Sequence, residues 1–242
     1  PNVLLGGCAG GGGRFDAGML CYFPQIWCSD NTDAVERLTI QHGTSFGYPV
    51  SCMGAHVSAC PNHQTGRTTP LWTRAVVAMS GTFGYELDLG RLTDEEREEV
   101  KEQIETFKRY YDVIQNGAYY RLSDPNTQPR YTAWQTVTGT ESLVSLVLTH
   151  PEANARPLHL FLRGLDENAL YRVDELQLYG TANTPEAAGP DTASLAGAVF
   201  SGSTLMYAGC TLPHLTGDVP SVQMHPKVKG GIWFGSENTI YC

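Results

Sequence analysis

The stretch Cys8–Ala34, CAGGGGRFDAGMLCYFPQIWCSDNTDA, concentrates the most unusual local chemistry of the chain. The apolar segment Val3–Leu5 before it predicts a strand that runs into the glycine run Gly10–Gly13. Glycines there permit a positive φ and the close approach of a ligand. A second predicted strand, Gln25–Cys28, runs into the polar segment Ser29–Asp33. Two successive strand ends therefore carry polar groups, and α/β barrels and open sheets build their sites at such ends.

The pattern continues outward from this stretch to about residue 80. Tyr48–Cys52 predicts a third short strand, which ends near His56, and Asp33–His42 has the apolar spacing of a helix. After a polar loop, Pro70–Met79 predicts an apolar helix. Strands that alternate with helices indicate parallel pairing, as in a barrel.

The clearest single element is the helix that begins after Thr93. Thr93 with Glu96 three residues later predicts a capping box, in which each side chain bonds the other residue's backbone N–H. Asn116-Gly117 predicts the C-terminal cap. Between these signals an apolar stripe follows a helical spacing: Val100, Ile104, Phe107, Tyr111 and Ile114.

After Gly117 the pattern changes to short β-forming segments between turn residues. Spacings of about eight to twelve residues between such segments are typical of an antiparallel sandwich. A loop rich in Ala, Thr, Pro and Gly, 181–196, interrupts the series. The predicted strands are Tyr119–Leu122, Tyr131–Val137, Leu143–Thr149, Leu158–Leu162, Leu170–Val173, Leu176–Tyr179, Ala198–Ser201 and Thr204–Tyr207.

Composition excludes several classes of protein. The 242 residues carry 41% hydrophobic and 17% charged side chains, which argues against disorder and coiled coils. A net charge of −9 without a basic run argues against nucleic acid as a partner. No apolar run reaches the roughly 18 residues of a membrane helix. Membrane partners are not expected either.

Seven cysteines lie at scattered positions without Cys-x-x-Cys spacing. Structural zinc sites use closely spaced pairs, so no metal is expected. An odd count in a chain of this size also argues against a disulfide framework. The cysteines therefore predict buried free thiols in a reducing compartment, the cytoplasm.

Three long motifs carry a family resemblance: CAGGGGRFD from Cys8, QIWCSDNTD from Gln25, and VSCMGAHVSACPNHQTGR from Val50. Together they resemble the last third of the catalytic barrel of glycoside hydrolase family 36, the microbial and related α-galactosidases. The resemblance extends over about residues 2–223. It implies the C-terminal part of a (β/α)8 TIM barrel over 1–117, an antiparallel β-sandwich domain over 118–225, and a divergent tail over 226–242.

The resemblance also implies an activity and roles for particular residues. The family releases terminal α-linked galactose from oligosaccharides such as melibiose and raffinose with retention, without a cofactor, and the intact enzyme is expected to be a homo-oligomer. Asp30 matches the family's general acid/base, and Cys8 and Gly10 match the galactose subsite near the 2-hydroxyl. Asp33 matches a carboxylate on the helix side, behind Asp30. A relative acting on α-linked N-acetylgalactosamine would need more room beside Cys8 and Gly10.

One departure from the family pattern limits this reading. The family nucleophile is the aspartate of a Lys-Trp-Asp motif on an earlier barrel strand, and these 242 residues contain no Trp-Asp pair. A retaining glycosidase needs two carboxyl groups about 5–5.5 Å apart. The sequence therefore predicts a fragment that is inactive by itself. The alternative is a remnant that at most binds sugar weakly or serves as a structural domain.

The residues by themselves leave several roles open. Asp30 or Asp33 can simply cap the following helix, and Trp27 can stack on a sugar or pack in the core. Arg14 can bind a sugar or a carboxylate, or form an ion pair with Asp16 or Asp33. His56 can line the sugar pocket, although a loop histidine bonded to a backbone carbonyl is common.

Overall fold

The computed structural model describes residues 3–8, 10, 13, 15–153, 155–179 and 195–229, and the backbone of the two short strands Trp233–Phe234 (β14) and Ile240–Tyr241 (β15). Arg14 lies outside the described residues, as does the predicted loop over 181–196 apart from its last two residues. Most of the predicted tail over 226–242 lies outside them as well.

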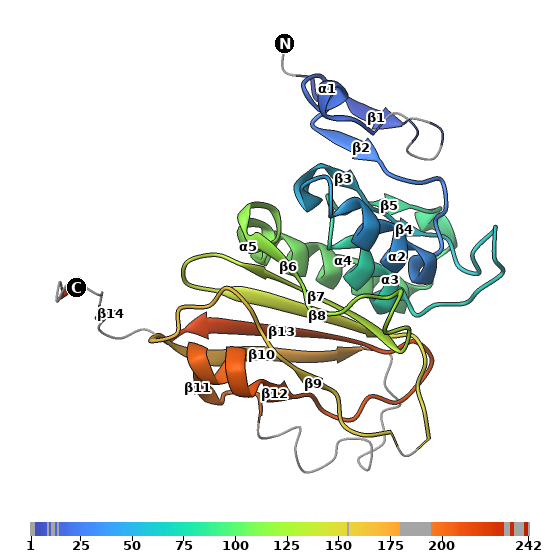
Figure 1. Cartoon of the computed structure of the whole chain (residues 1–242). Coiled ribbons are helices and arrows are strands. Elements are labelled where there is room, and N and C mark those ends of the chain that lie inside the picture. The colour runs from blue at the N-terminus through green and yellow to red at the C-terminus, as the bar shows by residue number, and fades with distance from the viewer. Residues whose placement is uncertain are drawn as a thin grey trace.

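The N-terminal layer consists of short parallel strands, as the sequence predicts. Strands β1 (Gly6–Cys8), β2 (Gln25–Trp27) and β3 (Met53–Gly54) form one parallel sheet in that order. Strand β4 (Val57–Ser58) pairs in parallel with β5 (Tyr85–Glu86). Figure 1 shows this layer at the top of the molecule. Short helices follow the first strands: α1 (Ala17–Leu20) and α2 (Ala34–Thr44).

Two of the predicted strands begin later in the chain than expected. Val3–Leu5 precedes β1, which begins at Gly6, and its three apolar side chains are exposed. Residues Val50–Cys52 form a 3-10 turn, in which the Cys52 N–H donates to the Pro49 carbonyl at 3.2 Å. The fixed φ of Pro49 favours this turn, and the strand begins only at Met53.

The helical layer contains α3 (Leu71–Ala78), α4 (Asp94–Arg109) and α5 (Tyr111–Asn116). The capping box is confirmed: the Glu96 N–H donates to Thr93 Oγ1 at 3.2 Å, and the Thr93 N–H donates to Glu96 Oε2 at 2.9 Å. The prediction of one continuous helix is wrong, since the helix is interrupted at Tyr110, between α4 and α5. The Tyr110 side chain is buried and donates to Glu175 Oε2 at 2.6 Å.

This break changes the end of the predicted apolar stripe. Tyr111 is 53% exposed, whereas Val100 and Ile114 are buried as expected. Gly117 follows α5 in an extended conformation, without the positive φ of a common glycine cap. A Cβ at this position would lie 2.3 Å from the Val113 carbonyl oxygen, so close backbone approach requires the glycine.

The C-terminal half forms one six-stranded antiparallel sheet in the order β11-β10-β13-β8-β7-β6, and a separate pair, β9-β12. The prediction of Tyr131–Val137 is confirmed to the residue, and the two segments predicted over 170–179 are one strand with a register shift between Val173 and Glu175. The bounds are β6 Ala118–Arg121, β7 Tyr131–Val137, β8 Ser142–Leu148, β9 His159–Leu160, β10 Leu170–Tyr179, β11 Val199–Ser201, β12 Cys210–Thr211 and β13 Ser221–Val228.

Two features of this sheet differ from the expectation. Thr204–Ala208 is helical, so the strand predicted at Thr204–Tyr207 is wrong. Its carbonyl at Leu205 accepts from the Leu162 N–H at 3.0 Å, which fixes this turn over the sheet. The central strand β13 was not predicted, and it extends to Val228, past His225.

Both faces of the sheet are buried, which explains why β8 has no exposed residue. Leu146 and Leu148 face a cluster formed with the segment 158–165 and with Leu205. Val147 faces the other way, toward Val76 and Val77 of α3. Helices therefore cover one face, and the β9 and β12 segments cover the other (Figure 1). The molecule is a mixed α/β protein with an antiparallel sheet.

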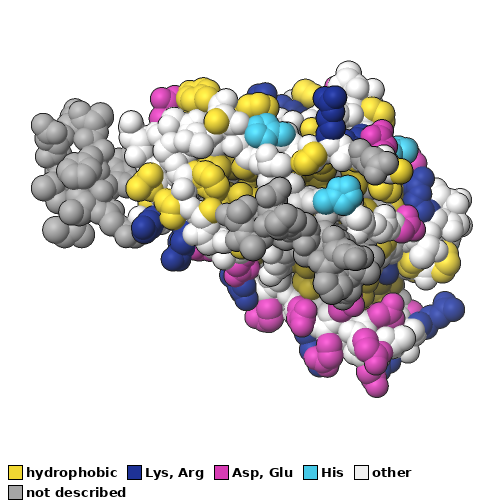
Figure 2. Space-filling model, turned by 90° about the horizontal axis from the view of Figure 1, so that it is seen from below, with side chains coloured by type: hydrophobic (Ala, Val, Ile, Leu, Met, Phe, Trp, Pro, Cys, Tyr) yellow, Lys and Arg dark blue, Asp and Glu magenta, His cyan; other side chains and the backbone are white. Residues whose placement is uncertain are grey.

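The surface below the sheet carries exposed apolar side chains between charged ones (Figure 2). Phe161 and Tyr207, from the segments that cover the sheet, are 52% and 68% exposed. Within the described part of the chain, every helix is too short or too polar to cross a membrane.

Candidate active site

The polar segment after β2 is organised by its own side chains. Ser29 Oγ accepts from the Asn31 N–H at 3.1 Å, and Asn31 Oδ1 accepts from the Asp33 N–H at 3.0 Å. Asp33 Oδ1 accepts from the Val35 N–H at 2.8 Å and caps α2. Every second residue therefore closes a local turn, and the helix-capping role falls to Asp33.

The Asp33 carboxylate has further partners. It is 1% exposed, and Arg67 Nη1 lies 2.9 Å from its Oδ1. The Thr65 hydroxyl donates to its other oxygen, Oδ2. The helix N-terminus, Arg67 and Thr65 together occupy both oxygens, so the Asp33 carboxylate is anchored at the start of α2.

Asp30 has a different environment. Its side chain is exposed, and among the residues that the structure describes none hydrogen-bonds to or pairs with its carboxylate. Its backbone is fixed instead, because Gln64 Nε2 donates to the Asp30 carbonyl at 3.1 Å. A carboxylate with a fixed backbone and no structural partner can transfer protons to and from a ligand.

Arg37 of α2 holds the ends of two strands together. It is 3% exposed, and its guanidinium donates to the Ser29 carbonyl at 3.0 Å and to the Gly54 carbonyl at 2.5 Å. The same group lies 4.4 Å from the centre of the Trp27 ring. Burial lowers the pKa of Arg37. Its contacts fix the distance between the carboxyl ends of β2 and β3.

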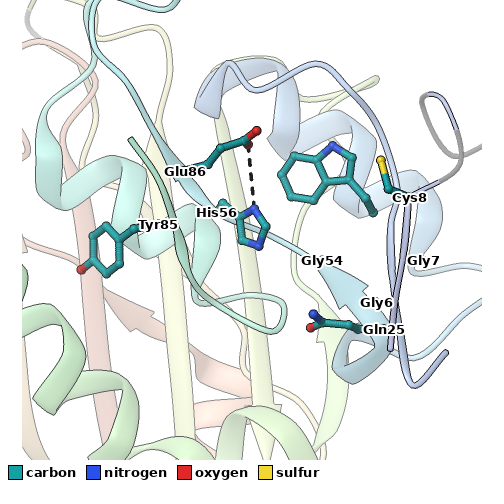
Figure 3. A pocket seen from close by; sticks show the side chains of 9 residues that line it. Gly6, Gly7, Cys8, Gln25, Gly54, His56, Tyr85 and Glu86 are labelled. Atoms are coloured by element: carbon teal, nitrogen blue, oxygen red, sulfur yellow. Dashed lines mark ion pairs between the residues drawn. The ribbon is translucent and has the colours of Figure 1, made fainter. Parts of the chain in front are cut away.

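A cavity of about 320 Å³ runs along β1 and β2, from Gly6 and Gln25 at their starts to Cys8 and Trp27 at their ends. Three of the predicted site residues, Cys8, Trp27 and His56, line it. Asp30, Gly10 and Asp33 are not among the lining residues, although Asp30 follows Trp27 by three positions. Figure 3 shows the labelled side chains around this space. The full lining is Gly6, Gly7, Cys8, Gln25, Trp27, Gly54, His56, Tyr85 and Glu86.

His56 lies between Glu86 and Gln25 among the lining residues labelled in Figure 3. Its ring stacks on Trp27 with centroids 4.5 Å apart, and its Nδ1 lies 3.8 Å from Glu86 Oε2. Burial lowers the pKa of His56, and Arg37 lowers it further, while Glu86 acts in the opposite direction. A neutral imidazole beside a carboxylate offers both donors and acceptors to hydroxyl groups of a ligand.

Trp27 was expected either to stack on a sugar or to pack in the core, and the structure agrees in part with each interpretation. Its ring is half-buried and contacts His56 and Arg37, yet it still lines the cavity. Tyr85 contributes differently, because its ring points away from the cavity in Figure 3 and its hydroxyl donates to Gln103 Oε1 at 2.8 Å. Gly10 is exposed with φ of 57°, and a Cβ there would meet no atom within 4 Å.

Sequence reasoning missed six of the nine lining residues: Gly6, Gly7, Gln25, Gly54, Tyr85 and Glu86. Glu86 is the last residue of β5, but its position at a strand end could not mark it, because β5 has only two residues and was not predicted. No residue-type pattern marks it, because Glu86 reaches the cavity only through the parallel pairing of β4 and β5.

The cysteines also differ from the expectation. Cys52 and Cys210 are buried, but Cys8, Cys21 and Cys60 are exposed, because they lie on a sheet edge or in loops. All six cysteines in the described residues are free thiols. Across the described residues, no three His, Cys, Asp or Glu side chains form a group that could hold a metal ion.

Two family models match the chain. The model described as Melibiase matches residues 1–117, and the glycosyl hydrolase family 36 C-terminal domain matches residues 131–225. The chain belongs to glycoside hydrolase family 36. The two matched regions of this family 36 chain lie on either side of β6. The antiparallel sheet begins at this strand, after the helical layer.

Relatives of this family 36 chain are α-galactosidases. It is 50% identical over 225 residues to the bifunctional α-galactosidase/sucrose kinase AgaSK of Mediterraneibacter gnavus. This alignment covers 92% of this chain and 22% of that protein. It is 45% identical over 229 residues to the α-galactosidase AgaA of Geobacillus stearothermophilus, covering 94% of this chain and 28% of that protein. The chain thus spans about a quarter of the length of these relatives.

Solved structures agree with these relatives. The galactosidase domain of AgaSK superposes with a TM-score of 0.83 at 48% identity, over 95% of this chain and 29% of that one. An AgaA variant from Geobacillus stearothermophilus, solved in complex with raffinose, superposes with a TM-score of 0.82 at 44% identity, over 95% of this chain and 29% of that one.

Proposed function

We propose that this family 36 chain is part of a retaining α-galactosidase that releases terminal α-linked galactose from oligosaccharides such as melibiose and raffinose. One observation carries the proposal, and it concerns the two aspartates in the segment after β2. The Asp33 carboxylate is bound by α2 and Arg67, whereas the Asp30 side chain is exposed and has no partner among the described residues. The carboxylate at the position of the family's acid/base is therefore available for chemistry.

The chemistry assigns Asp30 two successive proton transfers. Its carboxyl group protonates the glycosidic oxygen as the bond to the leaving group breaks, and its carboxylate then takes a proton from the water that hydrolyses the galactosyl-enzyme. The nucleophile is a second carboxylate, about 5–5.5 Å away. By the family resemblance it lies in a Trp-Asp motif that these 242 residues do not contain.

The cavity supplies the sugar-binding part of the proposal. Cys8 at the end of β1 and His56 beside Glu86 present groups that can contact galactose hydroxyls. By the family resemblance, Gly10 is assigned to the subsite near the 2-hydroxyl, although it does not line the cavity, and Trp27 offers an aromatic ring. The reaction needs no metal or organic cofactor, because two carboxylates suffice.

The proposal includes the architecture. We assign 1–117 to the C-terminal part of a (β/α)8 barrel and 118–225 to an antiparallel sandwich domain. The parallel pairs of β1–β3 and β4–β5 support the first assignment, and the two buried faces of the six-stranded sheet support the second. A cytoplasmic, homo-oligomeric enzyme stays a prediction, supported for the compartment by six free thiols.

A second candidate is a weak galactose-binding module without turnover. It is favoured by the single carboxylate, Glu86, in the cavity lining and by the lack of a Trp-Asp pair. In that case the isolated chain binds galactose but releases no nitrophenol from a nitrophenyl α-galactoside. Turnover by the isolated chain that survives Glu86→Gln and disappears with Asp30→Asn would instead require a nucleophile elsewhere in the chain.

A chimera tests the function directly. The 242 residues replace the matching region of AgaA, whose remaining part supplies the other barrel strands. We expect raffinose hydrolysis, and a loss of about 100- to 10,000-fold in kcat/KM on Asp30→Asn, the usual range for a general acid. Asp112→Asn, in the exposed first turn of α5, is the matched control. A folded chimera whose activity survives Asp30→Asn contradicts the proposal.

A further inference from the structure

The loop Asn62–Arg67 is a compact unit that lies against the segment of Asp30. The Asn62 N–H donates to the Arg67 carbonyl at 2.9 Å, and the Gly66 N–H donates to the Asn62 carbonyl at 2.8 Å. Asn62 Oδ1 also accepts from the Gln64 N–H at 2.9 Å, and its side chain is buried. These bonds give the loop a fixed shape of its own, so it can hold a neighbouring segment.

Four side chains of this loop bind the segment Ser29–Asp33. Asn62 Nδ2 donates to Thr32 Oγ1 at 3.0 Å, and Arg67 and Thr65 bind the Asp33 carboxylate as described above. The contact made by Gln64 is of another kind. Its amide donates to the Asp30 carbonyl at 3.1 Å and accepts from the Thr32 N–H at 3.0 Å.

This pair of bonds complements the local turns. The side chains of Ser29, Asn31 and Asp33 each accept from a backbone N–H two residues further on. The backbone groups at the even positions, the Asp30 carbonyl and the Thr32 N–H, receive their partners from the Gln64 amide. A single planar amide that bonds both sides of Asn31 fixes the peptide planes next to Asp30, and thereby the direction of its Cα–Cβ bond.

We propose that Gln64 is a positioning residue for Asp30: its side-chain amide, bonded to the Asp30 carbonyl and the Thr32 N–H, aims the acid/base carboxyl group at the glycosidic oxygen. The inference rests on the proposed function, because it presumes that Asp30 transfers the proton. Gln64 itself touches neither the carboxyl group nor the cavity lining.

This role predicts a dependence on the leaving group. Proton donation is needed to expel an alcohol, such as the sugar released from raffinose, but not a dinitrophenolate, which leaves without a proton. A misaimed acid therefore lowers kcat/KM for raffinose and leaves kcat/KM for a dinitrophenyl α-galactoside almost unchanged. A general structural defect lowers both.

The first arm of the test needs no activity. In the 242-residue chain itself, we expect Gln64→Met to speed hydrogen exchange at the Thr32 amide by about five-fold, the effect of losing one ordinary hydrogen bond. Thr68→Ala, an exposed change in the adjoining residue after Arg67, is the control and leaves the exchange rate unaltered. An unchanged rate in Gln64→Met overturns the proposal.

The second arm uses the chimera. Gln64→Met is expected to lower kcat/KM for raffinose by about 10- to 100-fold, the scale of a misplaced catalytic group, and to change the dinitrophenyl substrate by less than about two-fold. Equal losses on both substrates, or no loss on raffinose, overturn the positioning role. If Asp30→Asn shows the leaving-group split and Gln64→Met does not, only this inference fails; if Asp30→Asn itself has no effect, the proposed function fails.

Discussion

Replacement of the two neighbouring aspartates should separate structure from chemistry. Asp33→Ala removes the cap of α2, which is worth about 1 kcal/mol, and a charged hydrogen bond with Arg67, worth about 1.5–3 kcal/mol. The Arg67 side chain is 36% exposed and can be solvated again, so the lower end applies. We expect a loss of about 2.5 kcal/mol in the free energy of unfolding.

Two companion variants divide this loss. Asp33→Asn keeps an oxygen that can cap the helix and loses only the charge, so about 1.5 kcal/mol is expected. Asp30→Asn changes an exposed side chain that has no partner among the described residues, and it should stay within about 0.5 kcal/mol of the parent chain.

Urea unfolding followed by tryptophan fluorescence measures all three variants. A double-mutant cycle with Arg67→Met isolates the ion pair, with a coupling of at least about 0.5 kcal/mol expected for groups in contact. The reasoning is refuted if Asp33→Ala stays within about 0.5 kcal/mol of the parent. It is equally refuted if Asp30→Asn costs as much as Asp33→Ala, because Asp30 would then be a structural residue.

Three further predictions concern the histidine, a glycine and a helix cap. Burial lowers the pKa of His56 below its ordinary 6.5, so the unfolded chain takes up the proton first and stability falls as the pH drops below 6.5; His56→Gln should flatten this dependence in urea unfolding at pH values of about 7 and 5. Gly202→Ala should cost about 1–3 kcal/mol, because the added Cβ would lie 1.9 Å from the Asp166 carbonyl oxygen. Thr93→Ala should cost about 1 kcal/mol by urea unfolding, since it removes the capping box.

Each of these has a contradicting outcome. An NMR titration that places the His56 pKa above 6.5 would reverse the sign argued from burial. Gly139 has open space around its Cβ position, so Gly139→Ala is the control for Gly202→Ala, and equal losses would refute the steric reason. For Thr93, an equal loss in Thr93→Ser would show that the hydroxyl is not the source of the cap.

Local patterns predicted the elements that depend on local contacts. The capping box at Thr93 and the strand Tyr131–Val137 match the structure, because their signals lie within a few residues of each other. The central strand β13 was missed, because its buried polar residues hide the usual apolar signal. Gln223 and His225 find distant partners there, as in the 3.0 Å contact between His225 and Glu141.

The site shows the same division. Sequence placed Cys8, Trp27 and His56 near strand ends, and these residues line one cavity. The sequence left open which aspartate caps α2, since both positions suit a cap, and the 2.8 Å bond from the Val35 N–H to Asp33 Oδ1 decides it. Gln64 and Glu86 could not be found from local pattern, because each reaches the site through a contact between distant segments.

The role of Asp30 is tested most directly by the galactosyl azide formed when Asp30→Ala is placed in the chimera. With a dinitrophenyl α-galactoside the galactosyl-enzyme still forms, and azide needs no base to attack it from the face that Asp30 occupied. The account predicts α-galactosyl azide. Formation of β-galactosyl azide would contradict it, because direct attack opposite the leaving group would mean that Asp30 is the nucleophile.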